Sequence, residues 1–574
     1  MPCSFLSPPW AAGLRRIVLP FFGSLLVLSC RCTDVVRPLQ PGTQTPVSLN
    51  TLTHRVLQVS GDGRIIPHLK GLTRENKKRF AGKYQSSAQT DSAYLQQLFA
   101  ALRQRRPRHI IVLSHGGLVT FKSGLNRALR VEQDAGLKLW RPNADTAFLY
   151  LNWNAGFFST YGEHLITNQG QVQPLHRPLL AAYGLGVLAP LHLATDLGRG
   201  AVKFPLNSLQ YASEPALFSI GLSRPPLFYQ LGGTQWNRQV HSVNQISGRL
   251  RTDFMRHRGT ADSTLQISLG PNKSKGAFYY HVVQPIVWLP TRLATLVLGE
   301  ALGQPAWRSM LRRTQTMFHR PIVDPSSPDQ PTAQTQKKHV NQASRREETS
   351  RYMSQPGVVL RFADSLEVYR KWRARQEPAA NLAGATVTLV GHSMGCIVMK
   401  NMLQESLLQP KERRLQCDHI VFMAAACTLQ DFRYAVAPYL QQQPKTRFYN
   451  LTLHPYREIT ENMAGDYSIR SLLRLPLDGS LLVMVDRLFT DPLTLNERTL
   501  GRWHNFVLAA ADTSFLPASI RSRVTLKAFG SGSRLTLGPQ IHGDFGNPRL
   551  AEKDCDVIFP EQFWTRKFRE AETK

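Results

Sequence analysis

The chain has 574 residues, 42% of them hydrophobic and 9% aromatic, which is ample for packed cores and excludes a largely disordered protein. Its 70 Lys and Arg against 39 Asp and Glu give a formal net charge of +31, which favours anionic partners. The basic residues are spread along the chain without zinc-finger spacing or an RNA-binding pattern, so we predict no specific nucleic-acid partner. Its seven cysteines include no CxxC pair and predict neither a disulfide framework nor a metal site.

At the N-terminus, two arginines precede an apolar stretch at residues 17–28, which is too short to span a membrane comfortably but typical of a signal-peptide core. The stretch ends Val27-Leu28-Ser29-Cys30. An apolar pair, a small residue and then cysteine resembles the lipobox of bacterial lipoproteins, which implies lipidation of Cys30. We expect a signal peptide at 1–29, a tether at 30–50 and an exported protein of the bacterial cell envelope, anchored to a membrane surface. An ordinary secretory signal or an uncleaved N-terminal anchor is the alternative.

The next part of the chain predicts strands that alternate with helices. Residues 54–59 and 64–66 flank Gly61-Asp62-Gly63, a hairpin pattern. Six runs rich in β-branched and aliphatic residues follow, at 110–113, 146–153, 386–390, 419–425, 448–453 and 523–529. Continuous apolar runs favour strands buried on both faces of a parallel sheet, and helical periodicity follows several of them, as at 393–405. The fold class predicted is α/β, with a mostly parallel sheet and helices on both faces.

One long interval interrupts this alternation. We expect residues 51–156 and 365–574 to form the two parts of a core, with a cap-like insertion at 157–364 between them. Within the insertion, residues 321–355 are rich in Pro, Ser, Gln and Thr and predict a low-complexity loop. Two further stretches, 179–194 and 285–298, are apolar on almost every side, so we expect them to be buried in protein or to face a lipid surface.

The residues that indicate chemistry lie at the end of the third of the six runs. Gly391-His-Ser393-Met-Gly395 follows an apolar strand and begins a helical pattern. Two glycines permit a tight strand-to-helix turn that exposes the serine at the positive end of the helix. The segment resembles the nucleophile elbow of lipases, esterases and thioesterases of the α/β-hydrolase superfamily, which implies that Ser393 is the nucleophile of an acyl transfer.

A serine nucleophile needs a base, which the superfamily places after the last strand. The final run is followed by Gly538-Pro-Gln-Ile-His542-Gly-Asp-Phe545, so the resemblance implies that His542 is the base. His454 and His504 are weaker candidates, because both precede the last strand.

The base in turn needs an orienting carboxylate, expected after the strand before last. Glu458 stands where that loop would begin and is the favoured acid. Asp466 is the second candidate. Asp486 is the third, at the end of an apolar run, 481–485, that could also be a helix.

Acyl transfer also needs donors aimed at the developing oxyanion. The first of the six runs continues into His115-Gly116-Gly117, which resembles the oxyanion loop of esterases. The resemblance implies that the amide of Gly116 or Gly117 and that of Met394 form the oxyanion hole.

These expectations describe a serine hydrolase, lipase-like or esterase-like, that cleaves a small-molecule or lipid ester or a thioester. It would use a Ser-acid-His triad and require neither a cofactor nor a metal ion. The alternative is a catalytically inactive lipoprotein on a hydrolase scaffold, which would bind an anionic partner through its positive surface.

Overall fold

The computed structural model describes residues 54–66, 91–125, 127–128, 146–166, 187–219, 266–269, 297, 299–321, 354–376, 385–454, 458, 461, 480–490, 492, 494–510, 512, 514–529, 539 and 541–546. The side chains of 206–219, 266–269, 321, 354 and 487 are outside this description, as is the burial of Gly546. The predictions for the signal peptide, Cys30, the tether and Asp466 fall on residues that are not described. The same holds for almost all of the stretches 285–298 and 321–355.

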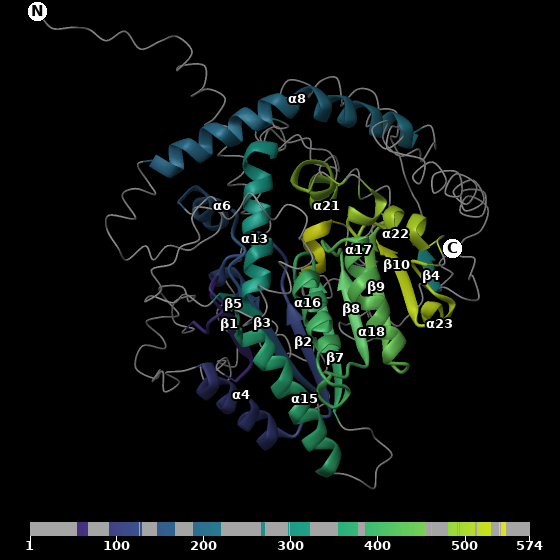
Figure 1. Cartoon of the computed structure of the whole chain (residues 1–574). Helices are drawn as coiled ribbons and strands as arrows, with labels where there is room; N and C mark the ends of the chain where they lie inside the picture. The colour runs from purple at the N-terminus through teal and green to yellow at the C-terminus, as the bar shows by residue number, and fades with distance from the viewer. Residues whose placement is uncertain are drawn as a thin grey trace, which may run out of the picture.

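A parallel β-sheet forms the centre of the molecule (Figure 1). Its strand order is β1-β3-β2-β7-β8-β9-β10-β4, and every neighbouring pair is parallel. The strands are β1 (Val56–Val59), β2 (His109–Ser114), β3 (Thr146–Trp153), β4 (Gln266–Leu269), β7 (Thr386–His392), β8 (His419–Met423), β9 (Arg447–Leu453) and β10 (Val524–Phe529). Seven of these run from β1 to β10, and the short β4 extends the β10 edge. The predicted α/β class with a parallel sheet is therefore confirmed.

The strands are buried as their apolar composition predicts. All eight residues of β3 are buried, because helices and loops cover the sheet. Register brings the carboxyl ends of the central strands together: Ser114 of β2 pairs with Gly391 of β7, and His392 of β7 pairs with Met423 of β8. Polar side chains that follow these strands consequently meet at one edge of the sheet.

All six predicted runs are strands, with ends that differ by at most two residues. The predicted hairpin is reduced to β1 and an isolated antiparallel bridge between Val59 and Ile65. Strand β4, which lies within the 157–364 interval, was not predicted. Its four residues, Gln-Ile-Ser-Leu, are too few to produce a clear alternating pattern.

The longer helices are α4 (Asp91–Arg105), α6 (Phe157–Ile166), α8 (Ala189–Ser219), α13 (Gln304–Thr316), α15 (Val358–Gln376), α16 (Gly395–Leu408) and α22 (Trp503–Ala510). Shorter helical segments are η4 (Gly299–Gly303), η6 (Lys411–Arg413), α17 (Leu429–Asp431), η7 (Phe432–Val436), α18 (Ala437–Gln442), α21 (Leu481–Met484), η8 (Val485–Phe489), η9 (Leu495–Glu497), α23 (Ala518–Arg521) and η11 (His542–Gly546). A two-stranded antiparallel sheet joins β5 (His319–Pro321) and β6 (Ser354–Pro356).

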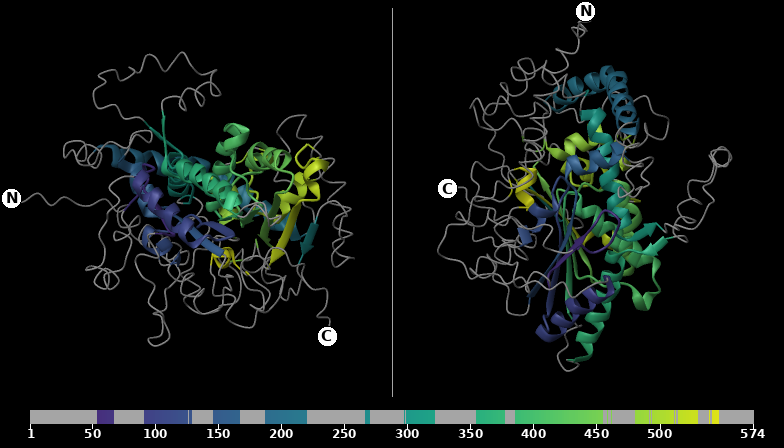
Figure 2. Two further views of the ribbon diagram at one scale, coloured as in Figure 1. Left: turned by 90° about the horizontal axis from the view of Figure 1, so that it is seen from below. Right: turned by 90° about the vertical axis from the view of Figure 1, so that its left-hand side faces the viewer.

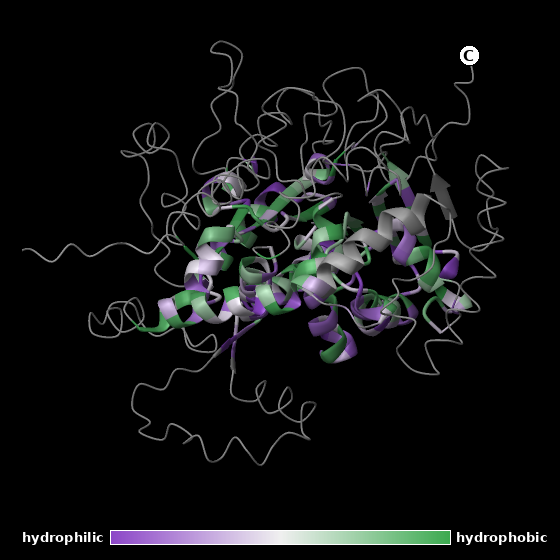
Figure 3. Cartoon of the chain, turned by 90° about the horizontal axis from the view of Figure 1, so that it is seen from above, coloured by the Kyte–Doolittle hydropathy of each residue, from purple (hydrophilic) through white to green (hydrophobic). Residues whose placement is uncertain are grey.

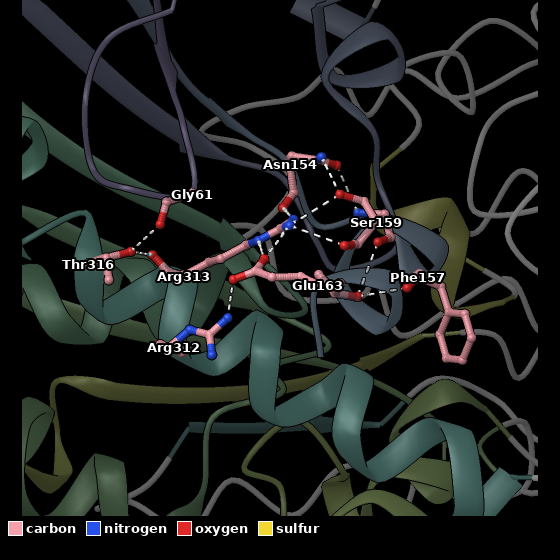
Figure 4. Close-up of polar contacts among 10 residues, drawn as sticks. Gly61, Asn154, Phe157, Ser159, Glu163, Arg312, Arg313 and Thr316 are labelled. Atoms are coloured by element: carbon pink, nitrogen blue, oxygen red, sulfur yellow. Dashed lines mark hydrogen bonds and ion pairs between the residues drawn. The ribbon is translucent and has the colours of Figure 1, made fainter. Parts of the chain in front are cut away.

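The end of the 157–364 interval packs into the same core as the sheet. Trp307 and Met310 of α13 are buried in the main hydrophobic cluster. Arg313 of α13 donates to the backbone oxygens of Asn154 and Ser159 and pairs with Glu163 of α6 (Figure 4). Because these contacts are buried, they tie α13 firmly to the segment that follows β3.

Helix α8 crosses one end of the molecule and packs on α6 and η4 (Figure 1; Figure 2, right). Helix α6 begins four residues after β3 ends, so α8 lies toward the carboxyl edge of the sheet. In the described part of the chain, no helix is both long enough and apolar enough to cross a membrane.

Candidate active site

Ser393 stands in a strained turn between β7 and α16. Its φ of 51° lies in the left-handed region, which is unfavourable for a residue with a Cβ atom. Backbone bonds hold the turn in place: the Ser393 amide donates to Met423 O at 2.8 Å, and Ser393 O accepts from the amides of Cys396 and Ala426, both at 3.1 Å. The strain therefore persists because the ends of two strands fix the turn.

The two glycines of the motif are required by space rather than by their own dihedral angles. A Cβ atom on Gly391 would lie 2.7 Å from Cys396 Cα, and one on Gly395 would lie 2.2 Å from Ser114 O. Both neighbours are backbone atoms, which cannot move away. The structure thus confirms the predicted strand–turn–helix setting of Ser393 and shows why its two flanking glycines are needed.

His542 lies beside this turn, at the start of η11. Its ring centroid is 5.2 Å from that of His392, and His392 Nε2–H donates to His542 O at 3.0 Å. The predicted nucleophile and base are therefore brought to one place from positions 149 residues apart, because 542 − 393 = 149. His392, whose role was not predicted, connects the loop of the base to the turn of the nucleophile.

The reactive atoms of this pair have no partners within the described residues. Ser393 Oγ and both ring nitrogens of His542 are buried there without a hydrogen bond, although Ser393 and His542 are only 1% and 3% exposed. No hydrogen bond joins the two residues in the described structure. Catalytic bonds are often long without substrate and form only in the complex, so the arrangement is compatible with a nucleophile–base pair.

Burial determines the protonation of the histidines. Removal from water lowers the pKa of His542 to about 4 and holds the pKa of His392 well below its usual value. The neighbouring ring of His542 lowers the pKa of His392 further. A neutral imidazole at His542 is able to accept a proton at neutral pH, as a general base must.

The predicted oxyanion loop packs directly on the turn. A Cβ atom on Gly116 would lie 2.9 Å from Ser393 Cβ, and one on Gly117 would lie 2.8 Å from Met394 Sδ. The next residue, Leu118, has a φ of 63°, so the loop is strained as well. The structure thus brings Gly116, Gly117 and Met394 together around Ser393, as the sequence predicts.

His115 orients this loop. Its Nε2 accepts from the Trp153 amide at 3.1 Å, so the proton is on Nδ1, which donates to Gly116 O at 2.8 Å. Burial lowers the pKa of His115 to about 4, which keeps this neutral tautomer. Since Gly116 O and the Gly117 amide belong to one peptide plane, the bond also fixes the direction of the Gly117 N–H. The sequence showed His115 only as part of the His-Gly-Gly run.

Glu458, the favoured acid, is buried but does not contact His542 through a hydrogen bond. The Ser480 hydroxyl donates to its Oε1, whereas Oε2 has no partner among the described residues. Burial raises the pKa of Glu458 to about 7, against the opposing effect of the Arg502 guanidinium. The structure therefore leaves its role as the triad acid a prediction.

Asp486 is fully engaged elsewhere. Its carboxylate accepts from the Thr499 amide (2.8 Å) and hydroxyl (3.1 Å), from Arg502 (2.9 Å) and from Asn505 (2.9 Å). The run that precedes it is helical, as α21 and η8, which is the alternative that the sequence left open. Four bonds to neighbouring segments of the chain hold the carboxylate, and no hydrogen bond links it to His542 in the described structure, so its role as an acid stays a prediction. Of the two weaker candidates for the base, His454 follows β9 and its amide donates to Phe529 O, whereas His504 is on α22.

No family model, curated protein or solved structure matches this chain. Among the described residues, no group of three His, Cys, Asp or Glu side chains could hold a metal ion.

Two residues of the site were not singled out by sequence reasoning, His115 and His392. Each is a polar residue at the end of an apolar strand and next to a glycine. A histidine in such a position is buried with its strand, and it must find a backbone partner. That pattern is the signal that could have found them.

Proposed function

We propose that the chain is a serine hydrolase of the α/β-hydrolase fold that cleaves an ester or thioester, with Ser393 as nucleophile and His542 as base. The observation that carries the proposal is the strained, glycine-enclosed turn at the carboxyl edge of the sheet. It holds Ser393 Oγ, without a partner among the described residues, beside an equally unpartnered imidazole. Strain of this kind persists at functional sites when the surrounding structure fixes it.

In the proposed reaction, Ser393 Oγ attacks the acyl carbonyl and its proton passes to His542. The carbonyl electrons move to oxygen, and the amides of Met394 and of Gly116 or Gly117 donate to the resulting oxyanion. Collapse of the intermediate breaks the acyl–oxygen or acyl–sulfur bond, and His542 returns the proton to the leaving group. Water, deprotonated by His542, then releases the acid and restores Ser393.

The surroundings of the turn support this assignment. The oxyanion loop follows β2, which pairs with β7, and this is where the superfamily places it. Glu458 follows β9 and precedes His542, which agrees with the chain order of nucleophile, acid and base. Glu458 is therefore our candidate for the carboxylate that orients the imidazole of His542.

Labelling with a fluorophosphonate probe tests the proposal. We expect one phosphonyl adduct per chain by intact mass, located on Ser393 by peptide mapping, and none in Ser393→Ala. Ser406→Ala is the matched control, because Ser406 is a buried serine of α16, the helix that follows the turn, and its hydroxyl donates to Leu415 O. An unlabelled parent chain would favour the inactive scaffold that binds an anionic partner, and an adduct that persists in Ser393→Ala would move the nucleophile elsewhere.

We also propose that the chain is exported and anchored as a lipoprotein through Cys30. Only Cys30 follows an apolar–apolar–small triplet at the end of the signal-like core, whereas Arg31 precedes Cys32. Metabolic labelling with a fatty-acid analogue should therefore disappear in Cys30→Ser and remain in Cys32→Ser. Label that persists in Cys30→Ser would contradict lipidation at this residue.

A further inference from the structure

Helix α8 has an apolar outer side. Val187, Pro190, Leu191, Ala194, Ala201 and Val202 are exposed and recur at helical spacing; we call them the α8 face. Leu191 is 58% exposed and Val202 is 79% exposed, the highest value of any large hydrophobic side chain in the described structure. Between residues 187 and 205, none of the exposed side chains is charged. Figure 3, which looks down on this end of the molecule, shows hydrophobic and neutral colours along much of the described half of α8.

The charged residues of this helix point the other way, into the protein. Asp196 is buried, accepts from His164 of α6 at 3.0 Å and forms an ion pair with Arg199 at 3.3 Å. Lys203 pairs with Glu300 of η4 at 3.1 Å, and Glu300 is fully buried. Surface helices normally bury their apolar side and expose their charges, so α8 has the reverse orientation. Buried ion pairs orient the helix and leave its apolar side toward solvent.

The net charge of the chain indicates which kind of partner would cover the α8 face. A second copy would bring two molecules of net charge +31 together, whereas an anionic lipid surface would attract one. Arg199 and Lys203 flank the face with side chains that are 27% and 31% exposed, but their charged groups pair with Asp196 and Glu300, so the attraction to lipid comes from the net charge of the whole chain. An amphipathic helix with these features lies in the plane of a membrane interface.

We propose that the α8 face docks on an anionic lipid surface. The helix would lie flat at the level of the head groups, with Leu191 and Val202 inserted among the acyl chains. Because α8 packs on α6, docking would bring the carboxyl edge of the sheet, where Ser393 stands, toward the lipid. The docking itself does not depend on the proposed hydrolase activity, and it is measured without any substrate.

Insertion is tested with the full chain and an added tryptophan. Val202→Trp is compared with Val368→Trp, which replaces a valine that is 56% exposed on α15. Difference spectra against the parent remove the emission of its nine tryptophans. With vesicles of anionic phospholipid that carry brominated acyl chains, we expect the emission from position 202 to shift to the blue and to be quenched. The emission from position 368 should keep its wavelength and intensity.

A second measurement compares binding. Leu191→Asp with Val202→Asp should weaken sedimentation with the same vesicles on the order of tenfold or more, because two apolar anchors are lost. Val368→Asp with Leu408→Asp adds the same charge at exposed positions on α15 and α16 and should leave binding near that of the parent.

Several results would overturn the proposal. Both pairs of aspartate substitutions could weaken vesicle binding equally, or the chain could bind vesicles without quenching of the emission from position 202. The chain could also bind zwitterionic vesicles as well as anionic ones, or bind no vesicles at all. A blue shift at position 202 that depends on protein concentration without lipid would assign the face to a second copy instead.

Discussion

Two buried polar clusters lie near the carboxyl edge of the sheet, and they differ in how their polar atoms are satisfied. Around Asp486, both carboxylate oxygens accept hydrogen bonds, Oδ1 from the Thr499 amide and Oδ2 from Thr499, Arg502 and Asn505. Around Ser393, the hydroxyl and both nitrogens of His542 are buried without partners in the described structure.

This difference distinguishes a carboxylate with a structural role from a hydroxyl and an imidazole that are available for a reaction. A buried polar atom without a hydrogen bond costs roughly 1–3 kcal/mol. Both oxygens of the Asp486 carboxylate avoid that cost, although Asn505 Oδ1 beside them is buried without a partner among the described residues. A reactive centre must keep its nucleophile and base available, and it accepts that cost. The backbone strain at Ser393, Leu118 and Ala424, all close to this edge, points to the same distinction.

The largest expected effect is on catalysis at the Ser393 cluster. Ser393→Ala should lower kcat/KM for an acyl ester that the parent cleaves by about 10⁴-fold or more, because the nucleophile is removed. His542→Gln should cost a similar factor, and the double variant should be no slower than the worse single variant, since the two residues act as one unit. Steady-state kinetics on a series of acyl esters measures this. Losses that add in the double variant would show that the two residues do not share a step.

Substitutions in the Asp486 cluster should change the stability of the fold. Asp486→Ala leaves Arg502 buried without its counter-charge and should lower the free energy of unfolding by about 3–5 kcal/mol. Asp512→Ala, at an exposed carboxylate that bonds only its neighbour Ser514 in the described structure, is the control and should change it by less than about 1 kcal/mol. Urea unfolding measures both. Normal stability with lost esterase activity would instead identify Asp486 as the triad acid.

The free energy of unfolding should depend on pH through His542, which lies beside Ser393. His542 has a pKa of about 4 in the folded chain and an ordinary value of 6.5, so the unfolded chain takes up its proton first as pH falls. The stability contributed by the neutral ring is complete above pH 6.5 and decreases toward pH 4, by up to about 3 kcal/mol. Urea unfolding between pH 7.5 and about 4.5 should show this fall, and His542→Gln should reduce its slope.

Glu458 should change the free energy of unfolding with pH in the direction opposite to that of His542. Its pKa is raised to about 7, so the folded chain keeps the proton that the unfolded chain loses near 4.5. Its penalty therefore grows as pH rises from about 4.5 to 7, and Glu458→Gln should gain stability mainly above pH 7. A gain of equal size at all pH values would contradict the buried, protonated carboxyl.

The smallest expected effect concerns the strain at Ser393. Ser393→Gly should raise the free energy of unfolding by about 1 kcal/mol, because glycine adopts a positive φ without the cost of a Cβ atom. Ser406→Gly, inside α16, should lower it by about 1 kcal/mol, because glycine has a low helix propensity and Ser406 has no positive φ to relieve. Equal destabilisation by both changes would show that the turn at Ser393 stores no strain.

The parallel strands and the Ser393 turn could be predicted from the sequence because their determinants are local. A buried strand needs a continuous apolar run, and the turn needs glycines at 391 and 395, whose space is taken by backbone a few residues away or on the paired strand. The His-Gly-Gly loop was identified for the same reason. His542 was found from chain order, and the structure placed it beside His392.

Other features depended on contacts between distant segments. Whether Glu458, Asp466 or Asp486 serves the base cannot be derived from spacing, and only the folded chain shows that Thr499, Arg502 and Asn505 occupy Asp486. Strand β4 has too few residues to be recognised without the edge of β10 beside it.

The apolar stretch at 179–194 was expected to be buried or to meet lipid, and the sequence could not decide between the two. The orientation of α8 is determined by Glu300, about a hundred residues away, and by His164 of α6. Local sequence thus determined which segments form strands and where the nucleophile turns, because backbone sterics and periodicity act over a few residues. Tertiary structure decided which carboxylates are occupied and which side of α8 is exposed, because charge pairing acts between segments that are distant in the chain.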